Sequence, residues 1–204
     1  MINLEPFRDM GVQTDFHLTD KELSMMACGL HRCPFSNVEA FMPELKYLIA
    51  AAPVRHADWV VDVKIHMLMA GQWPCIPNWH CDNVPRGNYG ADYSKASNEH
   101  NMLLWISGEP RTEVITDEIA VEPFVGHDAL RNALDAKQPS TSYIEPQRWY
   151  SFSQLSPHRG TVATQNTWRV FVRLTHRDVV SHRPVRSIVR RHAQVYLDSN
   201  KFVW

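Results

Sequence analysis

The chain has 204 residues, of which 44% are hydrophobic and 21% are charged, a composition typical of a soluble globular protein with one substantial core. Its formal net charge of -1 excludes a general electrostatic attraction to nucleic acid or to anionic membranes. No apolar run approaches the roughly 20 residues of a membrane helix, and the first residues lack the basic and then apolar pattern of a signal peptide. We therefore expect a single cytoplasmic domain spanning 1–204 without a membrane segment.

The N-terminal quarter of the chain combines an unpatterned stretch with helix signals. Residues 1–17 show no clear hydrophobic period, which predicts an irregular arm. Two capping boxes, in which a hydroxyl and a carboxylate satisfy free amides at a helix start, occur at Thr19-x-x-Glu22 and Ser36-x-x-Glu39. The second helix has a proline suited to a first helical turn, Pro43, and is expected to end before Pro53. The segment 1–57 is thus predicted to be an arm followed by helices.

The clearest strand lies between residues 59 and 69, where apolar residues alternate with others at a period of two. Its strongly apolar face would consist of Trp59, Val61, Val63, Ile65, Met67 and Met69. Further along, the segment 83–101 is polar and rich in Gly, Asn, Ser and Tyr. It is too long for a tight connection, which predicts a lid or substrate-binding loop at the mouth of a pocket.

The second half of the chain alternates short strands with one helix. Residues 102–106 and 113–116 indicate strands joined in a hairpin-like way through Gly108-Glu109-Pro110, and 126–136 has the apolar spacing of a helix. Strand character returns at 148–153 and again at 167–175. In this last strand Arg169 and Arg173 share one face, because alternate residues of a strand point the same way.

Helices followed by many short strands predict an α+β protein. We expect a double-stranded β-helix core of the jelly-roll or cupin-like kind at 58–182, preceded by the N-terminal helices and interrupted by one inserted helix. The segment 183–204 is predicted to be an arginine-rich tail packed on the outside. Closing two sheets into such a barrel would bring His80 and Asp82 to His158, which lies far along the chain.

These three residues are candidate metal ligands. Trp79-His80-Cys81-Asp82 places a histidine and an aspartate two residues apart, where both can bind one ion, and His158 in Ser156-Pro157-His158-Arg159-Gly160 supplies a third ligand. A His-x-Asp pair is weak evidence by itself, because His56-Ala57-Asp58 is a second example. Two imidazoles and one carboxylate on one side of an ion nevertheless form the ligand set of non-haem Fe(II) oxygenases.

The order of these motifs resembles the Fe(II)/2-oxoglutarate-dependent oxygenases, and within them the taurine dioxygenase-like branch. Trp79-His80-Cys81-Asp82 is similar to the Trp-His-x-Asp of that branch, and 108–112 looks like a degraded form of its Gly-Gly-x-Thr turn that lacks the second glycine. A helix at 129–136 falls where the branch has one. His158, followed after ten residues by Arg169 and after three more by Arg173, matches its distal spacing. The resemblance covers 79–176.

The resemblance implies a site for Fe(II), 2-oxoglutarate and dioxygen, with oxidative decarboxylation of 2-oxoglutarate coupled to hydroxylation of a substrate. Arg169 would bind the far carboxylate of 2-oxoglutarate, because a planar guanidinium forms two parallel charge-assisted bonds, and Thr112 would assist it. Arg173 would lie nearer the iron and contact the near carboxylate or an anionic group of the substrate. Trp79 and Trp105 are candidates for the pocket wall.

Two other functions stay open. A cupin-like metalloenzyme would use the same barrel and metal without 2-oxoglutarate, and a non-catalytic jelly-roll module would serve binding or assembly, since a fold does not decide function. A small molecule is the expected partner. The arginine-rich tail is most simply a solvated or interface surface, with nucleotide or nucleic acid as the other option.

The four cysteines, Cys28, Cys33, Cys75 and Cys81, have spacings wider than is usual for a zinc site. We therefore expect reduced, partly buried thiols rather than a structural zinc.

Overall fold

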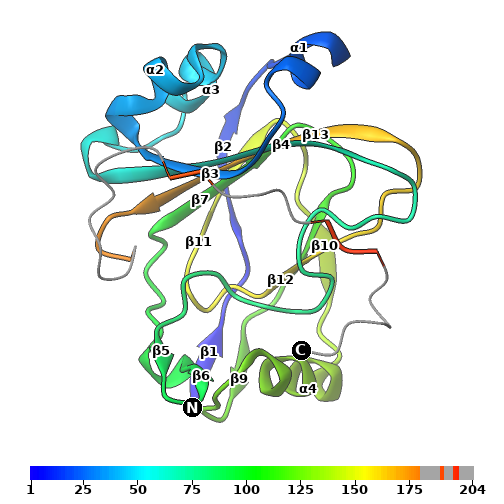
Figure 1. Cartoon of the computed structure of the whole chain (residues 1–204). Helices are drawn as coiled ribbons and strands as arrows, with labels where there is room; N and C mark the ends of the chain where they lie inside the picture. The colour runs from blue at the N-terminus through cyan, green and yellow to red at the C-terminus, as the bar shows by residue number, and fades with distance from the viewer. Residues whose placement is uncertain (180–188, 191–194, 198–204) are drawn as a thin grey trace.

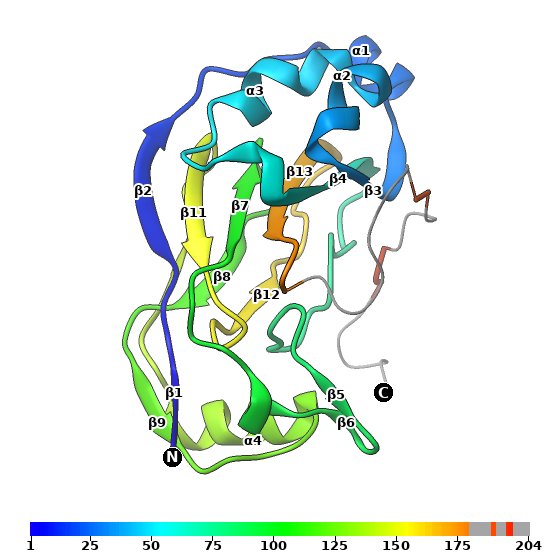
Figure 2. The same cartoon turned by 90° about the vertical axis from the view of Figure 1, so that its left-hand side faces the viewer.

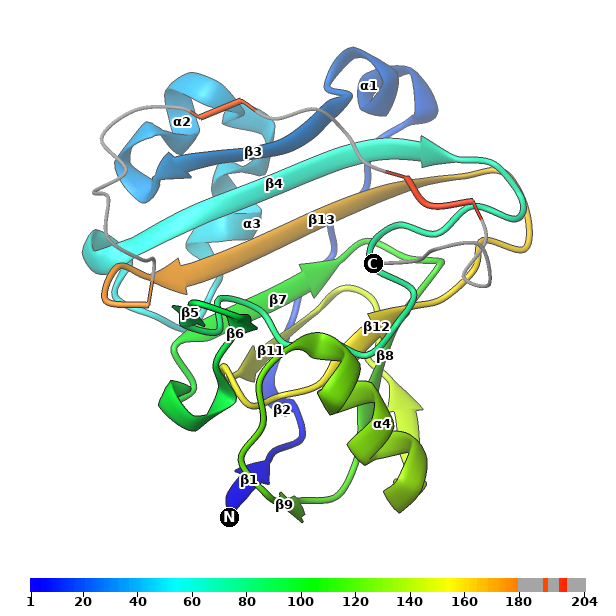
Figure 3. The ribbon, with the colours of Figure 1, turned by 60° about the horizontal axis from the view of Figure 1, so that its bottom comes forward.

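The computed structural model of the protein describes residues 1–179, 189–190 and 195–197 (Figure 1). Within these residues the protein is an α+β structure built mainly from antiparallel sheets, so the predicted class is confirmed at this level. The largest sheet has six strands in the order β2-β11-β7-β13-β4-β3, as Figure 3 shows. Their bounds are Arg8–Gln13 (β2), Arg148–Phe152 (β11), Met102–Ile106 (β7), Thr167–His176 (β13), Trp59–Leu68 (β4) and Cys28–Pro34 (β3).

Short helices cover one face of this sheet (Figures 1 and 2). They are α1 (Asp20–Met25), α2 (Val38–Phe41) and α3 (Lys46–Ala50), with 3-10 turns at Phe35–Asn37, Pro43–Leu45 and His56–Asp58. Leu45 and Ile49 pack with Val63 of β4 and Val172 of β13 in the main core. The alternating apolar residues at the centre of the two long strands are thus buried under the helices, whereas Met67 and Met69 of the predicted apolar face are exposed.

A smaller sheet packs on the other side. Its order is β10-β8-β12, with bounds Thr141–Tyr143 (β10), Thr112–Ile115 (β8) and His158–Gly160 (β12). Leu104 and Ile106 of β7 share a buried cluster with Val114 of β8. The face of the large sheet opposite the helices is therefore covered in part by the small sheet, and the side chains between the two sheets are buried.

One helix and two small strand pairs complete the described chain. The helix α4 (His127–Lys137) lies at the end of the molecule away from α1 to α3 (Figure 2) and buries Leu130 and Leu134 against Trp79 and Ile115. The paired strands are β1 (Ile2–Leu4) with β9 (Ile119–Val121), and β5 (Arg86–Gly87) with β6 (Gly90–Ala91), followed by a 3-10 turn at Tyr93–Lys95. Of the described helices, none is long and apolar enough to span a membrane.

Local signals predicted the helices better than the edge strands. Thr19 caps α1 through a complete capping box with Glu22, and Pro43 begins a helical turn, both as predicted. The second capping box is wrong, because the hydroxyl of Ser36 bonds the side chain of Asn37 rather than a helix amide. The irregular arm at 1–17 is wrong as well, since it contains β1 and β2.

Two pairings depend on distant residues and were not predicted. β3 was missed, and it pairs with β4 at the edge of the large sheet. The hairpin between 102–106 and 113–116 is wrong, because β7 pairs with β11 and β13 whereas β8 pairs with β10 and β12. The chain passes from one sheet to the other at Gly108-Glu109-Pro110, and this passage places Thr112 opposite the inner face of the large sheet.

Candidate metal centre and its two cavities

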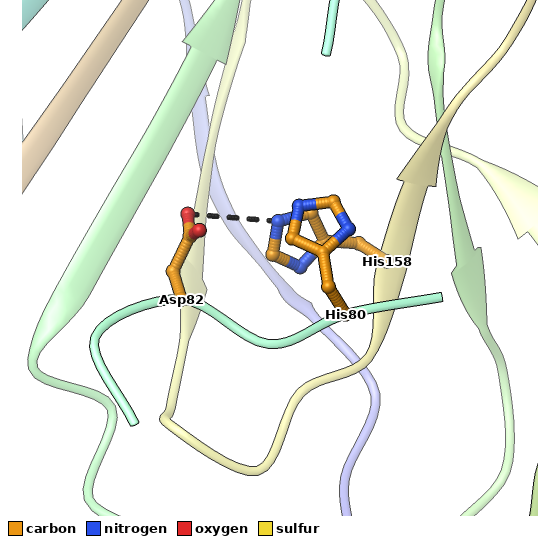
Figure 4. A group of neighbouring side chains, drawn as sticks. All are labelled: His80, Asp82 and His158. Carbon is orange, nitrogen blue, oxygen red and sulfur yellow. Dashed lines mark ion pairs between the residues drawn. The ribbon is translucent and has the colours of Figure 1, made fainter. Parts of the chain in front are cut away.

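The structure brings His80, Asp82 and His158 together, although they come from distant parts of the sequence (Figure 4). His80 and His158 form an isolated antiparallel bridge, with backbone bonds of 3.1 Å from the His80 N–H to the His158 carbonyl and 2.9 Å in the reverse direction. Asp82 follows two residues later, and one possible ligand atom from each of the three side chains lies within 4.8 Å of the others. In the described part of the chain this is the only cluster of three or more possible metal ligands.

Backbone carbonyls fix the tautomer of both rings. Nδ1 of His80 lies 2.9 Å from the carbonyl oxygen of Asn78, and Nδ1 of His158 lies 3.1 Å from that of Ser156. Because a carbonyl oxygen can only accept, each Nδ1 carries the ring proton and each Nε2 keeps its lone pair. Nε2 of His158 lies 3.5 Å from Oδ2 of Asp82, so this second layer of contacts presents the ligating nitrogens on the side of the carboxylate.

The electrostatics favour the forms of these groups that bind metal. Burial lowers the pKa of His80 to about 3, and the neighbouring His158 acts in the same direction, so the ring of His80 is neutral near pH 7. Burial by itself would raise the pKa of Asp82, but its contacts with the guanidinium of Arg173 and the ring of His158 outweigh burial and hold that pKa well below its ordinary value. Neutral imidazole and ionised carboxylate are the ligand forms that a divalent metal requires.

An inner cavity of about 170 Å³ extends from the three ligands between the two sheets. Arg169, which is only 1% exposed, also lines this cavity, and it donates from Nε to the carbonyl of Pro110 at 3.0 Å and from Nη2 to the hydroxyl of Thr112 at 3.3 Å. Within the described residues, no carboxylate lies at ion-pair distance from Arg169. The structure thus places a buried guanidinium, bonded only to neutral acceptors, in one cavity with the candidate ligands.

Sequence reasoning missed Lys64, a second cation of this cavity. Lys64 lies on the same face of β4 as His66, is buried, and donates from Nζ to the carbonyl of Pro74 at 2.8 Å. Burial lowers its pKa to about 8. His66, directly opposite Arg169 in the strand register, is buried, and neither of its ring nitrogens has a hydrogen-bond partner among the described residues. The alternation of β4 revealed its apolar face, but nothing in the sequence showed that the polar face is buried too.

Arg173, unlike Arg169, is bonded to carboxylates. Its Nε and Nη2 donate to Oδ2 of Asp62 at 3.0 and 2.7 Å, and its Nη1 donates to Asp82. Burial would lower the pKa of Arg173, but the two carboxylates outweigh it and raise that pKa above the ordinary value. The predicted contact of Arg173 with an anionic cosubstrate or substrate is therefore replaced in the structure by bonds to two carboxylates of the chain itself.

An outer cavity of about 720 Å³ adjoins the candidate ligands and shares His80 and Asp82 with the inner one. Eight of its lining residues belong to 83–101: Asn83, Val84, Pro85, Arg86, Ala91, Ser97, Glu99 and Asn101. The prediction that this loop borders the pocket is confirmed. The cavity lining contains both cationic and anionic side chains, with Arg86 on one hand and Glu99 and Asp178 on the other.

His127, the first residue of α4, also lines the outer cavity and was not predicted. Its Nδ1 lies 2.7 Å from the hydroxyl of Tyr93, and its ring stands edge-on to that of His80 with the centroids 6.4 Å apart. A histidine at a helix start has no distinctive sequence signal, so only the packing of α4 against the loop shows that it borders the site.

The two tryptophans predicted as pocket walls line neither cavity. Trp79 is buried against α4, with the guanidinium of Arg159 4.5 Å above its ring. Trp105 points into the main core and donates from Nε1 to the hydroxyl of Thr14 at 2.9 Å. Both are core residues and do not form the predicted pocket wall. Trp105 lies on β7 between Leu104 and Ile106, and alternate residues of a strand face opposite sides of a sheet, so it points away from the cavity.

The remaining candidates lie elsewhere. The four cysteines are free thiols, and none belongs to the cluster of possible ligands found in the described residues. His56-Ala57-Asp58 forms a 3-10 turn before β4. Most of the arginine-rich tail, including Arg183, Arg186 and Arg191, lies outside the residues that the structure describes.

No family model, curated protein or solved structure matches the chain. One possible ligand atom from each of two imidazoles and one ionised carboxylate lies within 4.8 Å of the others, and both imidazoles are held by backbone carbonyls. This donor set fits a divalent transition metal such as Fe(II) better than a hard cation such as Mg²⁺, which favours oxygen ligands.

Proposed function

We propose that this protein is an Fe(II)- and 2-oxoglutarate-dependent oxygenase that hydroxylates a small polar molecule. The observation that carries the proposal is the inner cavity, whose lining includes both the two-histidine, one-carboxylate ligand set and a buried arginine. A 2-oxo acid with a second carboxylate has a matching form, because its oxo acid end can bind a metal while the other end needs a cation.

The surroundings of Arg169 in the inner cavity fit a carboxylate. A guanidinium that is buried without an anion is costly, and Arg169 meets only neutral oxygen atoms of Pro110 and Thr112. A bound carboxylate would accept from Arg169 and from the hydroxyl of Thr112, with the ammonium of Lys64 nearby. The unpartnered imidazole of His66 beside Arg169 is a further sign that a polar ligand or water belongs there.

The arrangement of the sheets supports a double-stranded β-helix core. Two antiparallel sheets face one another, and the candidate ligands lie between them at the end where the loop 83–101 enters. In folds of this kind the space between the sheets holds ligands.

The bound iron and 2-oxoglutarate would supply the oxidising chemistry, in which dioxygen is reduced while 2-oxoglutarate is decarboxylated to succinate and the substrate is hydroxylated. His80, Asp82 and His158 would hold the metal and leave its remaining positions free. Arg169 would bind and orient the cosubstrate and so fix the distance of its oxo acid end from the ligands. The inner cavity would hold the cosubstrate, and the outer cavity would admit the substrate.

A metalloenzyme without a cosubstrate, or a non-catalytic module, accounts for less of the structure. A metalloenzyme without a cosubstrate does not explain why Arg169 and Lys64 are buried in the inner cavity. A non-catalytic module leaves the convergence of two tautomerically fixed histidines and an ionised aspartate unexplained as well. Neither is favoured by an observation of its own.

The test is formation of succinate by purified protein supplied with Fe(II), ascorbate, air and 2-oxoglutarate, because many such sites turn over slowly without their substrate. We expect succinate from the wild type and none above background from His80→Ala or Asp82→Ala. His176→Ala is the matched control, because His176 lies at the far end of β13 against Trp59. A folded wild type that binds Fe(II) but forms no succinate would favour the metalloenzyme, and one that binds no metal would favour the binding module.

A further inference from the structure

A row of three charged residues crosses the edge of the large sheet beside the metal site. Asp62 of β4 lies directly opposite Arg32 of β3 and directly opposite Arg173 of β13 in the two strand registers. Its carboxylate is fully buried and accepts four N–H groups. Arg32 donates from Nε at 2.7 Å and from Nη2 at 2.9 Å, and Arg173 donates from Nε at 3.0 Å and from Nη2 at 2.7 Å.

The row continues into the candidate metal site. Arg173 uses two of its nitrogens on Asp62 and directs the third, Nη1, to Asp82. Asp82 lies on a loop, and within the described residues the only side chains at ion-pair distance from its carboxylate are those of Arg173 and His158. Arg173 is thus the only charged contact from the large sheet to this ligand.

We propose that Asp62, held by Arg32, is a positioning residue for the metal ligand Asp82 and acts on it through Arg173. The inference rests on the metal site of the proposed function but not on 2-oxoglutarate. A guanidinium is planar and rigid, so fixing two of its nitrogens fixes the direction of the third. Residues that hydrogen-bond a ligating carboxylate orient it, and their loss typically lowers metal affinity by about 10- to 100-fold.

The charges of the row agree with this role. Burial would raise the pKa of Asp62, but Arg173 and Arg32 outweigh it and lower that pKa, so the carboxylate is ionised when it holds Arg173. Two carboxylates and two guanidiniums, Asp62 and Asp82 with Arg32 and Arg173, balance within the cluster. An ion pair serving stability alone would need no connection to Asp82.

The experiment measures Co(II) binding to the full chain by calorimetry and records the visible absorption of bound Co(II), which reports ligand geometry. Asp62→Asn should lower the Co(II) affinity by about 10- to 100-fold and change the spectrum. Asp62→Asn also removes a negative charge, so its effect alone does not separate positioning from electrostatics. Arg32→Gln is therefore the deciding variant. That change removes a positive charge, so a purely electrostatic effect would strengthen Co(II) binding, whereas loss of positioning weakens it.

Glu113→Gln is the matched control, because it removes a partly buried carboxylate that pairs with Arg159 at 2.7 Å and does not contact the ligand side chains. Should Asp62→Asn fail to fold, the double variant Arg32→Gln/Asp62→Asn keeps the charge balance and is measured in its place, with the same weakening expected. Unchanged affinity and spectrum in the Asp62 variants, or tighter binding in Arg32→Gln, would overturn the positioning role while the metal site stood. A wild type that binds no Co(II) would overturn both.

Discussion

Arg169 and Arg173 lie on the same face of β13, yet Arg169 is bonded only to neutral oxygen atoms whereas Arg173 is bonded to two carboxylates. The difference assigns them different tasks. Arg173 already pairs with two carboxylates of the chain, so its charge is balanced without a ligand. Arg169 has a buried charge that the described residues leave without an anion, and this is the group expected to bind a cosubstrate carboxylate.

Substitution of each arginine by lysine should therefore give different losses. Arg169→Lys keeps the charge but loses the forked pair of bonds, which should weaken 2-oxoglutarate binding by about 1.5 to 3 kcal/mol, roughly 10- to 150-fold, and leave Co(II) binding intact. Arg173→Lys should chiefly weaken Co(II) binding. Calorimetric titration of Co(II) and then of 2-oxoglutarate into each variant without dioxygen separates the two effects, and identical profiles for both variants would contradict the assignment.

Lys64 should make the binding of 2-oxoglutarate depend on pH. Burial lowers its pKa to about 8, so its ammonium is present below that pH and is lost above it. Among the described residues, the titratable groups around it include Arg169, which keeps its charge, His66, whose pKa burial lowers to about 2, and Cys75 and Tyr196, whose pKa values burial raises. An anion prefers the ammonium form, so its affinity should fall as the pH rises through about 8.

The measurement is titration of 2-oxoglutarate into Co(II)-loaded protein from about pH 6.5 to 9. The affinity for 2-oxoglutarate should fall by no more than about tenfold per pH unit. Lys64→Met keeps the length of the side chain and removes the charge. This variant should bind more weakly at pH 7 and show a flatter profile. An equally steep fall in Lys64→Met would assign the pH dependence to another group.

Gly160 is predicted to be required for the shape of the inner cavity. A Cβ at this position would lie 2.8 Å from Sγ of Cys75, which lines that cavity. Gly160→Ala should therefore lower the free energy of unfolding by about 1 to 3 kcal/mol, the usual range for overpacking. Denaturant unfolding should show that Cys75→Ala, which removes Sγ, abolishes most of this loss when combined with Gly160→Ala. Equal losses in both backgrounds would show that the contact is not the cause.

The sequence predicted the parts of the site that depend on local spacing. His80 and Asp82 are two residues apart, and the alternation of β13 placed Arg169 and Arg173 on one face. The two residues it missed on β4, Lys64 and Asp62, lie on a face that looks solvent-exposed from its polarity. They are buried among groups from other parts of the chain, the carbonyl of Pro74 beside Lys64 and the guanidiniums of Arg32 and Arg173 around Asp62, and such burial is a property of the tertiary structure.

Long-range pairing limited the prediction of the fold in the same way. Gly108-Glu109-Pro110 is a sound turn signal, but a turn does not determine whether the strands on its two sides pair with each other. Here they join different sheets. β2 and β3, at the two edges of the large sheet, have no alternation strong enough to identify them, since each buries few of its side chains. Tertiary packing stabilises these strands.

The most direct measurement is anaerobic titration of 2-oxoglutarate into the Fe(II)-loaded wild-type protein, followed by visible absorption. The proposed site predicts a weak charge-transfer band that saturates at one equivalent of 2-oxoglutarate, is weaker at the same subsaturating concentration in Arg169→Lys, and is absent in Asp82→Ala. A folded wild-type protein that binds Fe(II) without producing the band at any 2-oxoglutarate concentration would contradict the claim that this cavity holds both the metal and the cosubstrate.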